Sequence, residues 1–303
     1  MNIIYDVIII GAGPGGISAA IYARRAGLSS LLIEMAYVSG GQIINTAEVD
    51  NYPGIPGVSG MELANKFKEH ANTMGVSSVR AEVTDIVTED NIKKINTKDG
   101  QYEARSIIIA TGATHRLLGI KGEMELAGMG VSYCATCDGA FFKDKSVAVV
   151  GGGDVAVEDA IFLARLCKKV YVVHRRDELR AAKVLQDRLL ALANVEMLWN
   201  QVPEEIMGTG KVEKILLKDV KTQIKQEVDV DGVFVAVGMN PKTEAFKDMV
   251  AVDESGYIKA GEDCRTNVAR VYAVGDVRTK ALRQIITAAA DGANAITSVQ
   301  EDL

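Results

Sequence analysis

The feature that most constrains the fold is a glycine-rich turn that directly follows a short apolar segment near the N-terminus. The apolar run 7–10 is typical of a buried parallel strand, and it leads into Gly11-x-Gly13-x-x-Gly16. A helix-like stretch and a second apolar strand follow, and that strand ends at Glu34. Strand, glycine turn, helix and strand, with an acid about 20 residues beyond the glycines, form a complete dinucleotide-binding βαβ unit.

The same plan recurs in the second half of the chain. An apolar run, 147–150, leads into Gly151-x-Gly153-x-x-Ala156, and this motif tolerates alanine at its third place. The position 23 residues after the first glycine, which carries the acid in the first unit, is occupied here by His174. The sequence therefore predicts a duplicated α/β architecture whose two nucleotide sites differ chemically.

The difference lies in a basic cluster formed by His174, Arg175, Arg176 and Arg180. A carboxylate suits a free ribose 2′-hydroxyl, whereas the planar guanidinium fork pairs with the oxygens of a 2′-phosphate. The second unit is therefore predicted to bind NADPH, and the first an ADP moiety without the extra phosphate. The alternative interpretation of the cluster is a solvated, basic start of a helix.

Three further strands indicate how the units are connected. Apolar segments at 104–113 and 230–241 each reach a glycine near the close of a unit, and a third at 269–276 has no unit of its own. Its natural place is back in the first domain, so we infer that the second unit is inserted into the first. We expect two Rossmann-like, three-layer α/β domains with these bounds: 1–113, first part of the first domain; 114–241, inserted domain; 242–303, second part of the first domain.

The composition sets broad limits on function. The chain of 303 residues is 48% hydrophobic and 24% charged, which is ordinary for a globular protein. Its net charge of −6 gives no general reason to bind nucleic acid or an acidic membrane. We expect no signal peptide and no membrane span, because no stretch approaches about 20 apolar residues. Because the chain has only four cysteines, we do not expect a disulfide scaffold, and we expect a cytoplasmic location.

Two of the cysteines, Cys134 and Cys137, form a Cys-x-x-Cys motif that Asp138 follows at once. A zinc site needs about four ligands, but Cys167 and Cys264 stand alone and the histidines lack ligand spacing, so no metal is expected. A redox pair needs a short closing loop, a thiol that can leave as thiolate and an acid that manages the proton. Residues 134–137 supply the short loop and Asp138 the acid, so we interpret the pair as redox-active.

Taken together, these features resemble the low-molecular-weight thioredoxin reductases, which are class-II pyridine nucleotide-disulfide oxidoreductases. The resemblance runs the length of the chain. The matching segments occur in the family's order: GAGPGG, GGQ, DNYPG, ATGA, CATCDG, GGGDVA, HRR, VGDVR and RQIITAAADG.

The resemblance implies that the first domain holds FAD and the inserted domain holds NADPH. The implied role of Asp276 is to bind the flavin side of FAD, but from the sequence alone it is equally well explained as a turn residue after a strand. The residues implied at FAD are Gly11, Gly13, Pro14 and Gly15 at the pyrophosphate, Glu34 at the adenosine ribose, and Gly41, Gln42, Asn51, Thr111, Gly112, Gly275, Asp276, Arg283, Gln284 and Ile285 toward the flavin. Those implied at NADPH are Gly152, Gly153, Asp154, His174, Arg175, Arg176, Arg180 and Gly238.

The resemblance also implies a route for electrons, from NADPH to FAD, to the disulfide, and by thiol exchange to thioredoxin. In this scheme Cys137 faces the flavin, Cys134 attacks thioredoxin and Asp138 donates the proton. The family is homodimeric and rotates its NADPH domain about two connections. These correspond here to 112–115 and 238–242, whose glycines are also ordinary turn residues.

Two residues depart from the family pattern. Met129 stands where a basic residue is frequent, which puts partner choice in doubt, and Val155 replaces a hydroxyl residue at the second glycine turn. We expect the dithiol to act directly, since the sequence shows no cysteine relay at its C-terminal end. The alternatives are a related flavin disulfide reductase that serves another redox protein and a non-catalytic flavin-binding sensor, which would need neither HRR nor the dithiol.

Overall fold

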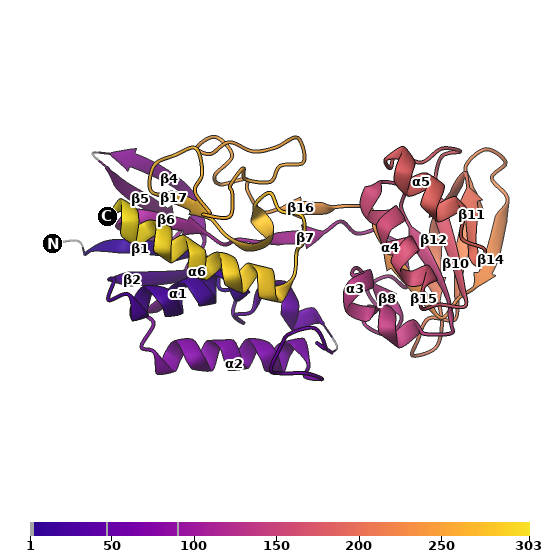
Figure 1. Cartoon of the computed structure of the whole chain (residues 1–303), viewed down its shortest axis with the longest axis horizontal. Helices are drawn as coiled ribbons and strands as arrows, with labels where there is room; N and C mark the ends of the chain where they lie inside the picture. The colour runs from indigo at the N-terminus through magenta and orange to yellow at the C-terminus, as the bar shows by residue number, and fades with distance from the viewer. Residues whose placement is uncertain (1–2, 47, 90) are drawn as a thin grey trace. The chain divides into compact units, whose positions relative to one another are not determined.

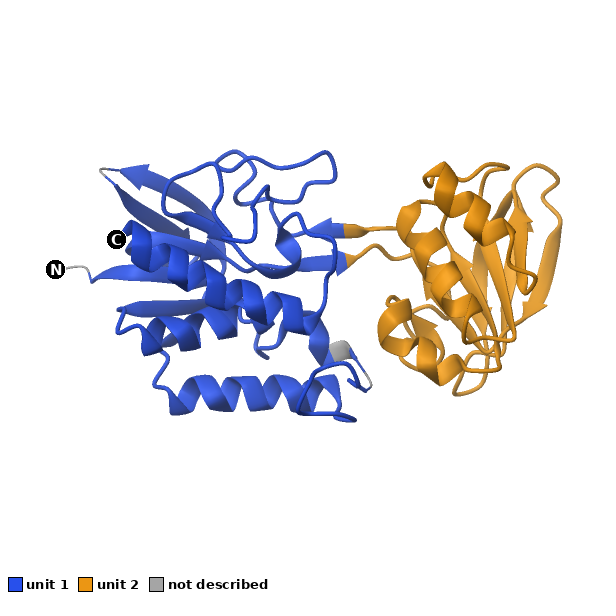
Figure 2. Ribbon diagram, viewed as in Figure 1, with its two compact units in different colours: residues 1–114, 240–303 blue, residues 115–239 orange. Residues whose placement is uncertain are grey.

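The computed structural model describes residues 3–46, 48–89 and 91–303. It divides into two compact units (Figure 2). Unit 1 comprises residues 1–114 and 240–303, and unit 2 comprises residues 115–239. The divisions lie one and two residues from the expected domain bounds. Each unit is built on a sheet with a parallel centre, and in unit 1 two antiparallel strands extend it, so the predicted α/β class is confirmed.

Unit 1 contains a seven-stranded sheet whose central strand pair is β1 and β6. The long strand β6 changes partner along its length. Residues 100–104 pair with β5 in antiparallel fashion, and residues 107–109 pair with β17 in parallel. The strands, in sheet order, are β3 (Ser78–Arg80), β2 (Ser30–Glu34), β1 (Ile4–Ile10), β6 (Gly100–Ile109), β5 (Ile92–Thr97) and β4 (Val83–Glu89), with β17 (Val271–Ala273) also on β6.

Both faces of the sheet are covered at its central parallel strands, which explains the apolar runs in β1, in β2 and at the end of β6. Val7 and Ile9 face a core shared with α1 and α6, whereas Ile8 and Ile10 face a second core on the opposite side. The main helices of this unit are α1 (Pro14–Arg25), α2 (Gly60–Thr73) and α6 (Ile285–Asp302), and short 3-10 turns lie at η1 (Gly41–Asn45) and η3 (Gly275–Val277).

The first and last helices of unit 1, α1 and α6, lie side by side (Figure 1). Their contact is close enough that a Cβ built on Gly292 would lie 2.3 Å from the Gly15 carbonyl oxygen. The Ser18 hydroxyl also donates to the Ala289 carbonyl at 2.7 Å. Among the helices that the structure describes, none combines the length and apolar character needed to cross a membrane.

Unit 2 repeats the three-layer plan. Its parallel sheet packs on α4 through one face and on a three-stranded antiparallel sheet through the other. The parallel strands, in order, are β11 (Val195–Trp199), β10 (Lys169–His174), β9 (Ser146–Val150), β15 (Gly232–Val235) and β8 (Val131–Ser132). The antiparallel strands are β12 (Gln201–Met207), β13 (Lys214–Asp219) and β14 (Lys225–Asp229), and the helical segments are α3 (Ala135–Asp138), η2 (Gly139–Phe142), α4 (Asp154–Ala164) and α5 (Lys183–Leu190).

The two connections between the units pair with each other. The first contains β7 (Ala113–His115) and the second contains β16 (Met239–Pro241), and together these form a two-stranded sheet. Just inside unit 2, the Arg116 amide donates to the Gly238 carbonyl at 2.9 Å. The segments expected to act as hinges are therefore ordered as one ribbon of two strands.

Candidate active site

The first glycine turn has no room for side chains at two of its positions. Gly11 has a φ of +109°, and a Cβ there would lie 2.4 Å from the Ala110 carbonyl oxygen. A Cβ at Gly16 would lie 1.8 Å from the Gly11 carbonyl oxygen. Gly13 then precedes the first turn of α1. The turn therefore presents bare backbone at a helix N-terminus, which suits a pyrophosphate.

Glu34 ends β2 beside this turn. Its carboxylate accepts hydrogen bonds from the Ala12 amide at 2.6 Å and the Ala36 amide at 2.7 Å. It lines a cavity of about 160 Å³ together with Tyr37 and Arg80. The Arg80 guanidinium lies 4.1 Å from the centroid of the Tyr37 ring. The sequence did not single out this stacked pair, although Arg80 ends the neighbouring parallel strand and so falls at the same edge of the sheet.

Segments distant in sequence meet at the other end of the expected FAD site. The Asn51 amide donates to Oε1 of Gln284 at 3.0 Å, and Gln284 caps α6. A Cβ built on Gly41 would lie 3.3 Å from the Gly13 Cα, so the η1 turn approaches the glycine turn. The structure therefore joins two residues expected at the flavin, Asn51 and Gln284, and places a third, Gly41, against the glycine turn expected at the pyrophosphate.

Asp276 follows β17 and has a buried carboxyl oxygen, Oδ1, that lacks a hydrogen-bond partner within the described chain. Burial raises the pKa of this carboxyl, while Lys280 and Arg283 lower it. An unsatisfied buried acceptor fits a ligand that carries hydroxyl groups, such as the ribityl chain of a flavin. The Arg283 guanidinium lies 3.9 Å from the ring centroid of Tyr257.

The remaining residues expected at FAD lie near the same strand ends. The Thr111 hydroxyl donates to the Lys242 carbonyl at 2.7 Å, so it ties the two chain connections together. Gly112 and Gly275 have φ values of +69° and +72°. The others fall in turns or at the first residues of helices: Pro14 and Gly15 in α1, Gln42 in η1 and Ile285 in α6.

In unit 2, Cys134 and Cys137 are joined by a disulfide bond whose Cα atoms are 5.3 Å apart. The short helix α3 makes this closure possible. Cys134 caps α3, and its sulfur accepts a hydrogen bond from the Cys137 amide at 3.2 Å. Both cysteines are half-buried, and Thr136 between them is exposed. No cluster of three potential metal-ligating acids, histidines or cysteines occurs in the described ranges.

Asp138 lies at the end of α3, next to the disulfide. Burial raises the pKa of its carboxyl, and a 2.6 Å hydrogen bond from the Ser132 hydroxyl lowers it. The same hydroxyl accepts from the Cys134 amide at 3.1 Å, so Ser132 links the acid to the first cysteine. The sequence did not single out Ser132, and its only signal was a hydroxyl two residues before the motif.

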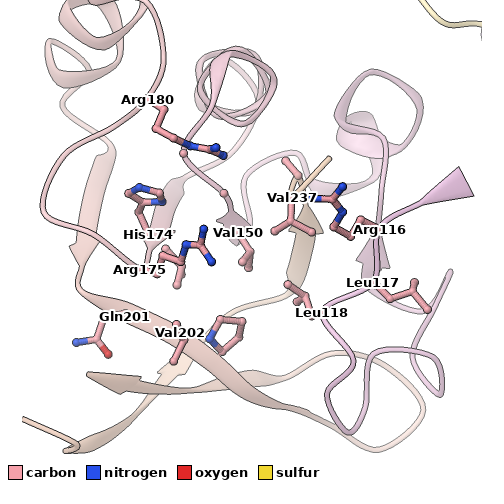
Figure 3. Close-up of a pocket in the computed structure, with 15 residues that line it drawn as sticks. Arg116, Leu117, Leu118, Val150, His174, Arg175, Arg180, Gln201, Val202 and Val237 are labelled. Carbon is pink, nitrogen blue, oxygen red and sulfur yellow. The ribbon is translucent and has the colours of Figure 1, made fainter. Parts of the chain in front are cut away.

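A cavity of about 400 Å³ lies at the carboxyl ends of β9, β10 and β15 (Figure 3). Arg175 and Arg180 line it, and Arg176 does not. Arg116 also lines it, although no sequence motif had marked that residue. The guanidinium groups of Arg175 and Arg116 both extend toward the interior of the cavity in Figure 3. The cavity can therefore hold a ligand with several negative charges.

His174 lines the cavity from beneath the second glycine turn and is only 5% exposed. A Cβ built on Gly152 would lie 2.2 Å from Cε1 of the His174 ring, so only glycine fits above it. Burial lowers the pKa of His174, and the charges of Arg180 and Arg175 lower it further. The ring is therefore neutral at pH 7 and supports the turn from below.

Gly153 and Gly238 flank the same region. Two other residues at the second turn, Asp154 and Val155, have side chains that are placed differently from those of typical cofactor ligands. The Asp154 carboxylate accepts from the Ala182 amide at 2.7 Å, so it braces the segment that leads into α5. Val155, the second residue of α4, is 63% exposed. An exposed apolar side chain therefore stands where the family resemblance implied a hydroxyl residue.

Comparisons with known proteins agree with this arrangement. The sequence model of the pyridine nucleotide-disulphide oxidoreductase family matches residues 5–292. Thioredoxin reductase from Listeria innocua is 48% identical over 98% of this chain and 93% of its own length, and that from Bacillus subtilis is 46% identical over 98% and 94%.

Two solved structures extend the comparison. Thioredoxin reductase from Streptococcus pyogenes is 47% identical, covers 99% of this chain and 98% of its own, and superposes with a TM-score of 0.94. The Lactococcus lactis enzyme in its FR conformation is 45% identical, with 98% coverage of both chains and a TM-score of 0.66. The chain therefore belongs to the pyridine nucleotide-disulphide oxidoreductase family, among its thioredoxin reductases.

Proposed function

We propose that the protein uses NADPH to reduce the disulfide of a thioredoxin, through FAD and the Cys134–Cys137 pair. The observation that carries this proposal is the disulfide itself, which lies beside a buried acid in the unit that also contains the arginine-lined cavity. A sensor that only binds flavin needs neither feature, and a thiol-independent reductase does not need the disulfide.

FAD is assigned to unit 1. Its pyrophosphate is held by the backbone of Gly11, Gly13 and Gly15, and its adenosine ribose by Glu34. The missing space for Cβ atoms in the turn and the unpartnered Oδ1 of Asp276 support this assignment. Asn51 and Gln284, which are hydrogen-bonded to each other, lie toward the flavin.

NADPH is assigned to unit 2. Arg175 and Arg180 bind the 2′-phosphate, and the turn at Gly152 and Gly153 faces the pyrophosphate. Both arginines line the cavity beside that turn, which supports the assignment. Arg176 does not line the cavity, so we assign it a smaller part in binding the 2′-phosphate.

When bound, NADPH supplies a hydride and FAD passes the electron pair to the disulfide. The Cys134–Cys137 bond takes up two electrons and breaks, and with two protons the pair becomes a dithiol. Cys134, as thiolate, then attacks the disulfide of thioredoxin and forms a mixed disulfide, which Cys137 breaks as it restores the internal bond. Asp138 exchanges the proton that this step moves between sulfurs, and burial of the carboxyl, which raises its pKa from the ordinary value, favours that role.

Turnover further requires unit 2 to rotate about the two connections, since the dithiol and the nicotinamide must use one flavin in turn. The solved relatives support this step. Two of them, 47% and 45% identical to this chain, superpose with TM-scores of 0.94 and 0.66. Equal sequence similarity with unequal superposition is expected when the same two domains are held at different relative orientations.

We also infer a cytoplasmic homodimer, as the family resemblance implies. The other two cysteines are compatible with a reducing compartment. Cys167 and Cys264 are free and buried, and burial raises the pKa of their thiols to about 11 and about 12. Neither is therefore prone to form the reactive thiolate at neutral pH.

Anaerobic titration of the purified flavoprotein tests the function. NADPH should bleach the flavin absorbance, and oxidised thioredoxin should then restore it as thioredoxin thiols appear. The Cys137→Ser variant is the matched control, because NADPH should still bleach its flavin while thioredoxin no longer restores the colour. Failure of NADPH to bleach the wild-type flavin would refute the NADPH assignment, and failure of thioredoxin to restore it would refute the partner.

A further inference from the structure

Arg116 enters the nucleotide cavity from the side opposite Arg175 and Arg180. Arg175 follows the last residue of β10, and the Arg180 amide donates to the Gly152 carbonyl at 2.7 Å. Arg116 is instead held beside β15, through the 2.9 Å bond from its amide to Gly238. Figure 3 shows Arg116 next to Val237, across the cavity from Arg180 and His174.

The order of the strands indicates which part of a bound dinucleotide each arginine would meet. In the sheet, β9 lies between β10 and β15. Strands are spaced about 4.8 Å apart, so the ends of β10 and β15 are roughly 10 Å apart. A dinucleotide in such a fold lies across the strand ends, with its pyrophosphate over the glycine turn of the middle strand. With the 2′-phosphate at Arg175, the nicotinamide-side half extends toward β15 and Arg116.

The main chain of Arg116 belongs to the connections between the units. Residues 113–115 form β7, which pairs with β16, and the next amide along is bonded to Gly238. A ligand that holds the Arg116 side chain therefore also restrains the residue that follows the first connection. Rotation about the connections changes backbone angles at such positions.

We propose that Arg116 binds the nicotinamide-side phosphate and ribose of NADPH and thereby couples nucleotide occupancy to the order of the two connections. This inference rests on the proposed function, because it takes NADPH as the ligand of the cavity. A guanidinium suits this role, since its planar fork can bond phosphate oxygens and a ribose hydroxyl from one position. Arg175 and Arg180 recognise the adenosine-side phosphate, whereas Arg116 recognises the half that donates the hydride.

Binding of three nucleotides to the FAD-loaded protein separates these roles. NADP⁺ contains both halves, NAD⁺ lacks the 2′-phosphate, and 2′,5′-ADP lacks the nicotinamide half. Arg116→Met should weaken NADP⁺ and NAD⁺ by about tenfold or more and leave 2′,5′-ADP within roughly twofold. Arg175→Met should weaken NADP⁺ and 2′,5′-ADP and spare NAD⁺. Arg188→Met, at an exposed site on α5 outside the cavity, is the control.

Amide hydrogen exchange tests the coupling. In the wild type, saturating NADP⁺ should slow exchange in peptides that cover 112–117 and 238–242, and saturating 2′,5′-ADP should not. In Arg116→Met, saturating NADP⁺ should no longer slow it. Protection that survives in this variant would overturn the coupling.

Equal losses of NADP⁺ and 2′,5′-ADP in Arg116→Met would overturn the assignment of Arg116 to the nicotinamide half, as would unchanged NADP⁺ binding. A variant that fails to fold is recognised by loss of amide protection throughout unit 2, the unit that contains Arg116, and Arg116→Lys then replaces it with the same expected pattern at smaller amplitude. Wild-type protein that binds neither NADP⁺ nor 2′,5′-ADP would overturn the proposed function itself, which distinguishes the two failures.

Discussion

The Ser132 hydroxyl donates a 2.6 Å hydrogen bond to Oδ2 of Asp138, and so opposes the rise in carboxyl pKa that burial causes. The acid next to the disulfide is therefore set by two competing effects of which burial is the larger. A carboxyl that keeps its proton closer to neutral pH is better matched to exchange protons with thiols. The pKa of Asp138 can therefore be changed by altering either the hydrogen bond from Ser132 or the carboxyl itself.

Replacing Ser132 by alanine should raise the pKa of Asp138 further, because the hydrogen bond favours the charged form. If the protonated acid is required, the alkaline limb of the pH profile for thioredoxin reduction should move to higher pH. Steady-state kcat/KM for thioredoxin across the pH range measures the shift. Ser132→Thr, which keeps the hydroxyl, should retain the wild-type profile, and an unmoved limb in Ser132→Ala would separate Ser132 from the acid.

Asp138→Asn should lower thioredoxin turnover by about 10²–10⁴-fold, the usual contribution of a positioned acid. It should not lower stability at pH 7. The folded-state pKa of Asp138 is raised, so its contribution to stability declines as pH rises from the unfolded pKa through the folded value, and the neutral amide removes that penalty. Turnover and thermal unfolding should be measured together. A parallel loss of both would indicate a structural role only.

Arg175→Ala should lower kcat/KM for NADPH by about tenfold to a hundredfold and leave NADH nearly unaffected, since only NADPH carries the 2′-phosphate. Arg176→Ala is the matched control, because its side chain does not line the cavity. Kinetics with both nucleotides measure the effect. An equal effect of the two substitutions would show that Arg176 also binds the 2′-phosphate.

Val155→Thr should lower the KM for NADPH severalfold. The side chain is exposed at the second residue of α4, where a hydroxyl can donate to a pyrophosphate oxygen for about 1 kcal/mol. Val184→Thr, at a similarly exposed valine on α5, controls for the general effect of the substitution. A KM that stays the same in both would place the pyrophosphate away from this residue.

Cys134→Ser and Cys137→Ser should each keep FAD and its reduction by NADPH but abolish thioredoxin reduction, because hydride transfer to the flavin does not need sulfur. Stopped-flow flavin spectra and a thioredoxin assay separate the two half-reactions. Substantial turnover by either variant would contradict the dithiol mechanism.

The sequence predicts the parts of the fold that depend on local spacing. The two glycine turns, their flanking strands and the inserted order follow from residue types at fixed offsets, and the α/β class is confirmed. The strand expected over 7–10 extends to Ile4–Ile10, because pairing with β6 adds residues that the apolar pattern does not mark. The cofactor roles of individual residues stay predictions.

The features that the sequence does not predict depend on the tertiary path of the chain, which brings distant residues to the same cavity. Arg175 and Arg180 line the cavity while Arg176 does not, which the path of the chain after β10 decides and spacing does not. Arg116 reaches the cavity because its amide is bonded to Gly238, over a hundred residues later. No local sequence pattern predicts this contact.

His174 shows the same limit at one position. It matches Glu34 in spacing, and each side chain meets the residue just after the first glycine of its unit. Glu34 accepts a hydrogen bond from the Ala12 amide, whereas the His174 ring lies under Gly152. The equivalent position thus accepts a hydrogen bond from the backbone of one turn and packs beneath the other.

The close contact of α1 with α6 has a consequence for how the protein is made. The first helix of unit 1 is completed by the last helix of the chain, through the approach of Gly15 to Gly292. During synthesis on the ribosome, the continuous segment 115–239 can fold as soon as it emerges, since domains generally fold as units. Unit 1 must wait with its sheet incomplete until β17 and α6 are released, so the inserted unit is the first part of the newborn protein to reach its final form.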